Sequence, residues 1–192
     1  MQLSIEPSLR SVPDLRALVR SDFACILAHG LREREAGLGT LPERLGLVPA
    51  QLADLNDTWF PNLTLPDLDA PEPARLPDQE AIALLLLWRG GHATPESHWL
   101  AAIIGRRALE PRHLWEDLGL PSRLALSEMM ARHFPRIHSA NSQNMRWKKF
   151  FYRQICSDSD FALCLSPSCD SCDERDGCFA PEESGNGAAA PA

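Results

Sequence analysis

The fold follows from one stretch of sequence, Asp78-Gln-Glu-Ala-Ile-Ala-Leu-Leu-Leu-Leu-Trp88. Asp78 can cap the start of a helix there, and the pair Gly90 and Gly91 can end it. Between these ends the stretch is apolar on every side, which is typical of a helix that other helices surround. We therefore predict a buried central helix in an all-α protein.

Periodic apolar residues predict further helices on both sides of this stretch, and strand signals are nearly absent. The first predicted helix covers about 13–35 and is capped by Ser11; its apolar stripe consists of Leu15, Leu18, Val19, Phe23, Ile26 and Leu27. A short helix is predicted from Pro49 and another from Thr94. The remaining predicted helices cover about 111–119, 121–134 and 142–156, and Asn141 caps the last of them. The tryptophans within the predicted helices are interpreted as core residues: Trp88, Trp99, Trp115 and Trp147.

The chain of 192 residues has the length of one domain with a tail. We predict a single compact helical domain over 1–157, crossed by a proline-rich loop at 60–78. An irregular cysteine-rich, metal-binding segment is predicted over 158–182, followed by a disordered Gly/Ala/Pro-rich tail at 183–192.

Composition and charge exclude several classes of protein. No apolar run reaches the roughly 18 residues of a membrane span, and no secretory signal is visible at the N-terminus, so we predict a cytoplasmic protein. The segment 158–183 holds eight acids against one base and so accounts for the whole formal charge of −7. The remaining residues are neutral in sum, which argues against a general nucleic-acid binder, since such a protein needs a basic face. No phosphate-binding loop, G-x-S-x-G or HExxH motif is present, so we do not expect an enzyme.

Four of the six cysteines lie close together, in the pattern C-x4-C-x2-C-x5-C. They are Cys164, Cys169, Cys172 and Cys178. In a cytoplasmic chain, clustered cysteines favour metal binding over disulfides. The first spacings match those of plant-type ferredoxins, whereas zinc sites usually combine two separated C-x2-C pairs. The pattern therefore favours an iron–sulfur cluster, and structural zinc and disulfides stay open as alternatives.

A basic stretch without a single acid, residues 129–157, precedes the cysteines. Arg146, Lys149 and Arg153 share one face of the predicted last helix. This face could attract an anion, or dock a partner, or pair with the acidic cysteine segment. The spacing alone does not choose between these uses.

Other candidate ligands are weaker. His133 and His138 lie nearest the basic stretch and are the better candidates among the histidines, whereas His98 and His113 are interpreted as hydrogen-bonded core residues. Cys156 could supply a further sulfur near the cluster, although a buried thiol is the simpler interpretation. Cys25 is expected in the core of the first helix.

The C-terminal motifs resemble those of the NifQ family of nitrogen-fixation proteins. The resemblance is carried by the run from Asn144 to Cys156, by the four-cysteine pattern through Phe179, and by the motifs 113–120 and 132–135. It covers roughly residues 78–180, while residues 1–77 match only in their general helical character.

The resemblance implies a protein that carries molybdenum for assembly of the iron–molybdenum cofactor of nitrogenase. It implies an iron–sulfur cluster of the 3Fe-4S or 4Fe-4S type, with a Mo-3Fe-4S form, held by the four clustered cysteines. The implied partners are the NifEN scaffold, the nitrogenase iron protein, and molybdate or a molybdenum–sulfur species. A helical regulatory module with a structural zinc ion held by the four cysteines and a simple iron–sulfur electron carrier remain the alternatives.

Overall fold

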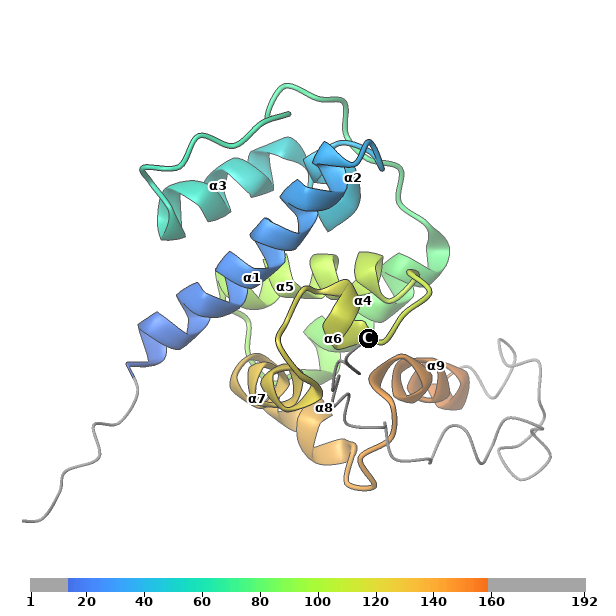
Figure 1. The fold of residues 1–192 in the computed structure, drawn as a ribbon. Helices are drawn as coiled ribbons and strands as arrows, with labels where there is room; N and C mark the ends of the chain where they lie inside the picture. The colour runs from blue at the N-terminus through green and yellow to red at the C-terminus, as the bar shows by residue number, and fades with distance from the viewer. Residues whose placement is uncertain (1–13, 159–192) are drawn as a thin grey trace, which may run out of the picture.

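The computed structural model describes residues 14–158, and within that part every regular element is a helix (Figure 1). The helices are α1 (Leu15–Glu35), α2 (Leu41–Leu45), α3 (Pro49–Trp59), α4 (Pro77–Arg89), α5 (Pro95–Arg107), α6 (Leu114–Asp117), α7 (Arg123–His133), α8 (Pro135–Ala140) and α9 (Trp147–Asp158). The all-α prediction is therefore confirmed for these residues. The predicted cysteine segment and C-terminal tail lie outside them.

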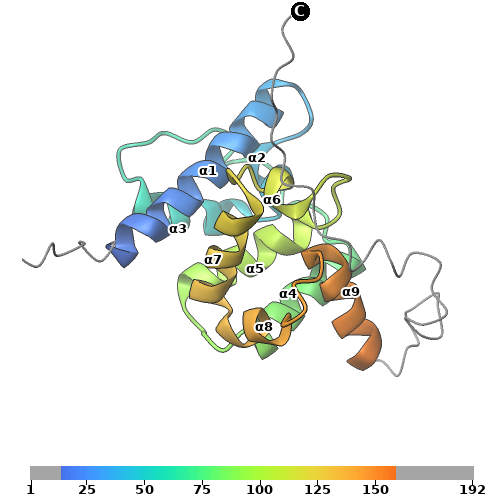
Figure 2. The same ribbon diagram turned by 60° about the horizontal axis from the view of Figure 1, so that its bottom comes forward.

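Helices α4 and α5 lie between two outer groups of helices, α1 to α3 on one side and α7 to α9 on the other (Figures 1 and 2). The more deeply buried of the two is α5, which contributes Trp99, Leu100, Ile103 and Ile104 to the core. Helix α4 packs along α5 and also against α8 and α9. The centre of the core thus lies one helix further along the chain than the sequence predicted.

The prediction that α4 is buried on every side was wrong. Ile82, Leu85 and Leu86 are buried, but Leu84 is 56% exposed and Trp88 is 82% exposed. Leu84 and Trp88 are four residues apart and so share the helix face that points away from α5. Trp88 is therefore not a core residue, whereas Trp99 and Trp147 are buried as predicted and Trp115 is half-buried.

Several helix ends differ from the prediction for reasons of local hydrogen bonding. Asp14, whose side chain accepts the Arg16 N–H, caps α1, and Leu15 just after it is exposed rather than part of the apolar stripe. Helix α4 begins at Pro77 after Leu76, so Asp78 lies in the first turn and is not the cap. Pro135 does not simply end α7, because it occupies the first turn of the unpredicted helix α8.

The loop between α3 and α4 contains no helix, as its prolines predicted. It is attached to α1 by Asp67, whose carboxylate accepts hydrogen bonds from Arg34 at 2.6 and 2.8 Å and from the Leu41 N–H at 3.0 Å. The Arg34 hydrogen bonds, with that of Leu41, lower the pKa of Asp67 to about 2. Within residues 14–158, no helix combines the length and the hydropathy that crossing a bilayer requires.

Candidate functional site

The four clustered cysteines, Cys164, Cys169, Cys172 and Cys178, lie outside the described residues, and so does the acidic segment around them. Cys156 lies within α9, but its side chain also falls outside the described part. The structure does describe the helix that leads into this segment. Since α9 ends at Asp158, Cys164 follows it after only five intervening residues.

Aromatic side chains fix α9 to the body of the protein. Trp147, Phe150 and Phe151 are buried, and the Trp147 ring centroid lies 5.8 Å from each of the two phenylalanine rings. On its other side Trp147 is stacked against His138 of α8, with ring centroids 6.3 Å apart. Burying a side chain of this size stabilises the fold by roughly 2–3 kcal/mol, so this end of α9 is firmly anchored.

Lys148, in the middle of the basic stretch, is a structural cation. Its Nζ lies 2.6 Å from Asp117 Oδ2 and also donates to the Glu110 carbonyl oxygen. Asp117 is only 1% exposed, and its backbone carbonyl accepts a 2.6 Å hydrogen bond from Arg107 Nε. A charge buried in this way costs several kcal/mol unless it is paired, so Lys148 is committed to Asp117.

The same region contains a larger buried ionic network. The Glu33 carboxylate accepts two hydrogen bonds of 2.8 Å from Arg107 and bonds of 3.0 and 3.1 Å from Arg44. Burial alone would raise the pKa of Glu33, but the hydrogen bonds from the two arginines outweigh it and hold the pKa at about 2. Helices α1, α2 and α5 are tied together by this carboxylate.

The structure separates the histidines that the sequence singled out. His133 is buried, and burial, with the nearby Arg132 charge, lowers its pKa to about 4. His138 is half-buried and lies 3.1 Å from the Ser127 hydroxyl through Nε2. His98 bonds the Thr94 carbonyl oxygen at 2.8 Å but is exposed, so only the hydrogen-bonding half of its predicted role is confirmed.

The basic face predicted from the sequence is only partly present, because α9 begins after Arg146. Arg146 precedes the helix, and its carbonyl accepts the Phe150 N–H. Lys149 and Arg153 are both exposed on α9. Arg132, another base of this stretch, lies 2.6 Å from Asp22 of α1. Arg132 and Lys148 therefore pair with acids of the helical body.

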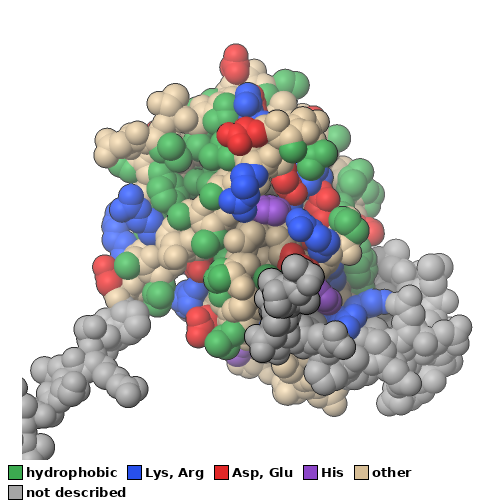
Figure 3. Space-filling view, viewed as in Figure 1, with side chains coloured by type: hydrophobic (Ala, Val, Ile, Leu, Met, Phe, Trp, Pro, Cys, Tyr) green, Lys and Arg blue, Asp and Glu red, His purple; other side chains and the backbone are tan. Residues whose placement is uncertain are grey.

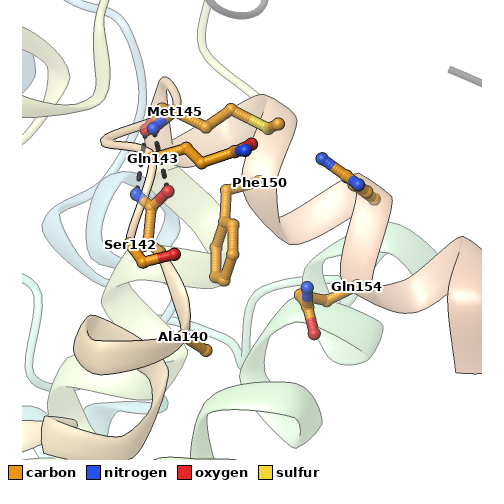
Figure 4. Close-up of a pocket in the computed structure, with 8 residues that line it drawn as sticks. Ala140, Ser142, Gln143, Met145, Phe150 and Gln154 are labelled. Atoms are coloured by element: carbon orange, nitrogen blue, oxygen red, sulfur yellow. Dashed lines mark hydrogen bonds between the residues drawn. The ribbon is translucent and has the colours of Figure 1, made fainter. Parts of the chain in front are cut away.

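A pocket lies between α9 and the loop that joins it to α8 (Figure 4). Its volume is about 330 Å³, and it is lined by Ala140, Asn141, Ser142, Gln143, Met145, Phe150, Arg153 and Gln154. Of these residues the sequence had singled out only Arg153 as a candidate contact. Asn141 was predicted to cap a helix, but it closes the loop instead, since its amide donates to the Met145 carbonyl oxygen at 2.9 Å and accepts the Met145 N–H at 2.8 Å.

On the face drawn in Figure 3, basic and acidic side chains are interspersed rather than gathered into one basic surface. Among residues 14–158, no group of three or more His, Cys, Asp or Glu side chains is arranged to hold a metal ion.

Comparison with known proteins settles the family. The NifQ family model matches residues 22–180, which include the anchored helix α9 and all four clustered cysteines. The chain belongs to the NifQ family. The match begins at residue 22, well before the region of roughly 78–180 in which the sequence motifs were recognised, so the NifQ likeness includes most of α1.

Curated relatives agree with this assignment. The chain is 66% identical over 157 residues to "Protein NifQ" of Rhodobacter capsulatus, an alignment that covers 82% of this chain and 87% of the relative. It is 40% identical over 166 residues to "Protein NifQ homolog" of Sinorhizobium fredii, covering 84% and 71% of the two chains. It is 38% identical over 186 residues to "Protein NifQ" of Azotobacter vinelandii, covering 88% and 95%. No solved structure matches this NifQ chain.

Proposed function

We propose that this protein is an iron–sulfur molybdenum carrier, which donates molybdenum for biosynthesis of the nitrogenase iron–molybdenum cofactor. Membership of the NifQ family ties the chain to nitrogen fixation and molybdenum processing. The observation that carries the finer proposal is the run Cys164-x4-Cys169-x2-Cys172-x5-Cys178, which falls inside the matched range and follows a firmly anchored helix.

The chemistry of the donor set suits this role. Thiolates are the ordinary ligands of iron–sulfur clusters, and four of them occur within one short run of this chain. Three thiolates can hold the irons of a cube whose remaining corner takes a thiophilic metal, and sulfide faces at that corner suit molybdenum. The molybdenum is cargo in this proposal, so the protein acts as a donor rather than as an enzyme.

The proposal includes partners and a location. By family resemblance, the molybdenum would pass to the NifEN scaffold together with the nitrogenase iron protein, and it would arrive as molybdate or a molybdenum–sulfur species. We propose the cytoplasm as the site of this transfer.

The direct test compares two cysteine variants purified without oxygen. Cys169→Ala should lose iron, acid-labile sulfide and molybdenum, while its helical circular dichroism persists, because the helices of residues 14–158 pack without that residue. Cys25→Ala is the matched control: Cys25 lies half-buried on α1, and its removal should leave the metal content unchanged.

Three results would contradict the proposal. Unchanged iron and molybdenum in Cys169→Ala would remove the cysteines from the site. Zinc in place of iron would indicate a structural zinc module. Iron without molybdenum uptake, with reversible cycling between two redox states, would indicate an electron carrier.

A further inference from the structure

We propose that the pocket between α9 and the 140–145 loop is a docking site for a tetrahedral oxyanion, with molybdate as the physiological ligand. The choice of molybdate rests on the proposed function, because a carrier must receive its metal before the metal reaches the cysteines. The oxyanion chemistry itself is argued from the residues that line the pocket.

Hydrogen-bond donors line the pocket from two sides. Ser142 and Gln143 come from the loop and face Phe150 and Gln154 of α9 (Figure 4). Arg153 adds a guanidinium, a planar and permanently charged group that is suited to oxyanions. Of the eight described residues that line the pocket, none is acidic.

A hydrogen bond from Arg89 engages the acceptor end of the Gln154 amide. Arg89 of α4 donates through Nη1 to Gln154 Oε1 at 3.2 Å, which occupies the acceptor end of the amide. The Gln154 NH₂ group is then the end available to a ligand oxygen. Arg89 also brings a second positive charge close to the pocket, in contact with one of its lining residues.

The loop side of the pocket is preformed. Asn141 is buried and uses both ends of its amide to close the loop onto Met145. Asn144 adopts a left-handed conformation with φ of 53°, and Arg123 of α7 donates to its Oδ1 at 3.0 Å. A site held in place before the ligand arrives binds it with a smaller loss of conformational entropy. Ser142 and Gln143 are therefore presented on a braced loop.

Size and position fit an oxyanion on its way to the cysteines. The cavity of about 330 Å³ has room for roughly ten water molecules, more than a five-atom anion needs with its bridging waters. Gln154 and Arg153 lie on the last turns of α9, ten and eleven residues before Cys164. An anion bound here would contact the part of the chain that directly precedes the cysteine segment in the sequence.

The test measures molybdate binding to the full chain by isothermal titration calorimetry, with sulfate as a competitor. Gln154→Glu keeps the size of the side chain but replaces a donor with a charged acceptor, and Arg153→Gln removes the guanidinium. Each should weaken binding at least about tenfold, the loss expected when a charge-assisted hydrogen bond to an anion is removed. Lys149→Gln removes one charge from the same helix without touching the pocket and should change affinity less than about twofold.

Measurements on two further variants distinguish failure of this inference from failure of the proposed function. Molybdate binding should survive in Cys169→Ala, because no pocket residue is a cysteine, and Gln154→Glu should keep the iron and sulfide of the wild type. Three results would each overturn the pocket assignment. The first is an equal loss of molybdate affinity in Lys149→Gln and Arg153→Gln, and the second is wild-type affinity in Gln154→Glu. The third is loss of molybdate binding in Cys169→Ala. A wild-type protein without iron would instead overturn the proposed function, and it would leave the pocket result standing.

Discussion

Lys148 of α9 and Asp117 of α6 form a part-buried ion pair, with 2.6 Å between Nζ and Oδ2. The pair joins the last described helix to the helical body through a carboxylate that is 1% exposed. Lys148 belongs to the basic stretch that the sequence offered for anion binding, yet its partner is an acid more than thirty residues earlier in the chain.

Lys148→Met should destabilise the fold by about 2–3 kcal/mol, because the buried Asp117 carboxylate then keeps only the exposed Arg112, 3.4 Å away, as its cation. Urea denaturation monitored by circular dichroism measures this loss. Lys149→Met is the matched control, since Lys149 is exposed on the same helix and its replacement should cost no more than about 0.5 kcal/mol. Similar losses in the two variants would contradict the structural role of Lys148.

The Glu33 network should make stability depend on acid pH. The pKa of Glu33 is about 2 in the folded protein against 4.5 for the unperturbed group. A depressed carboxyl pKa contributes stability above the unfolded pKa, and this contribution is lost as pH falls from about 4.5 towards 2. The contribution at neutral pH is roughly 3 kcal/mol. Glu33→Gln should therefore be less stable at pH 7 and should lose less stability in that window, as measured by thermal unfolding between pH 7 and 2. A variant with the same pH slope as the wild type would refute the assignment.

Gly119→Ala should destabilise the protein by more than about 2 kcal/mol, because it combines backbone strain with a steric clash. Gly119 has φ of +71°, and an added Cβ would meet the His29 side chain and lie 3.0 Å from the Cys25 carbonyl oxygen. Gly37→Ala is a close control, since Gly37 has φ of +76° but has nothing within 4 Å of an added Cβ. It should cost only the strain of about 1 kcal/mol. Equal denaturation midpoints for the two variants would show that Gly119 does not approach His29 and Cys25 of α1 as closely as described.

Replacing Trp99 of α5 should destabilise the protein strongly, whereas replacing Trp88 of α4 should leave its stability nearly unchanged. Trp99→Ala should cost about 3–5 kcal/mol, because Trp99 is buried and packs edge-on against Phe23 with ring centroids 6.1 Å apart. Trp88→Ala should change the free energy of unfolding by no more than about 0.5 kcal/mol. A large loss on replacing Trp88 would restore the central position that the sequence predicted for α4.

Trp88 also shows where sequence patterns stop being informative. A run such as Ala81 to Trp88 is apolar on every side, so it contains no period that tells an inward face from an outward one. Neighbouring helices make that choice, and their placement depends on contacts far apart in the sequence. The helices from Pro49 and from Thr94 were predicted well because a proline or a capping threonine marks their starts locally.

In the candidate site, too, local patterns could be predicted from the sequence and long-range contacts could not. The cysteine spacing is a local pattern: it predicts a donor set, which lies outside the described residues, and it indicated the family only together with the other C-terminal motifs. The pocket depends instead on Asn141 closing a loop, and an asparagine before an apolar run looks the same whether it caps a helix or braces a turn. Gln143 and Gln154 come together only in the fold, so no spacing could have paired them.

Elemental analysis of the wild-type protein decides whether this chain carries molybdenum on an iron–sulfur cluster. The protein is isolated under strict exclusion of oxygen from cells supplied with molybdate, and molybdenum, iron, acid-labile sulfide and zinc are measured on one sample. We predict molybdenum together with iron and sulfide in the proportions of a cube with one molybdenum corner. Zinc at one per chain without iron, or molybdenum without sulfide, would contradict this prediction.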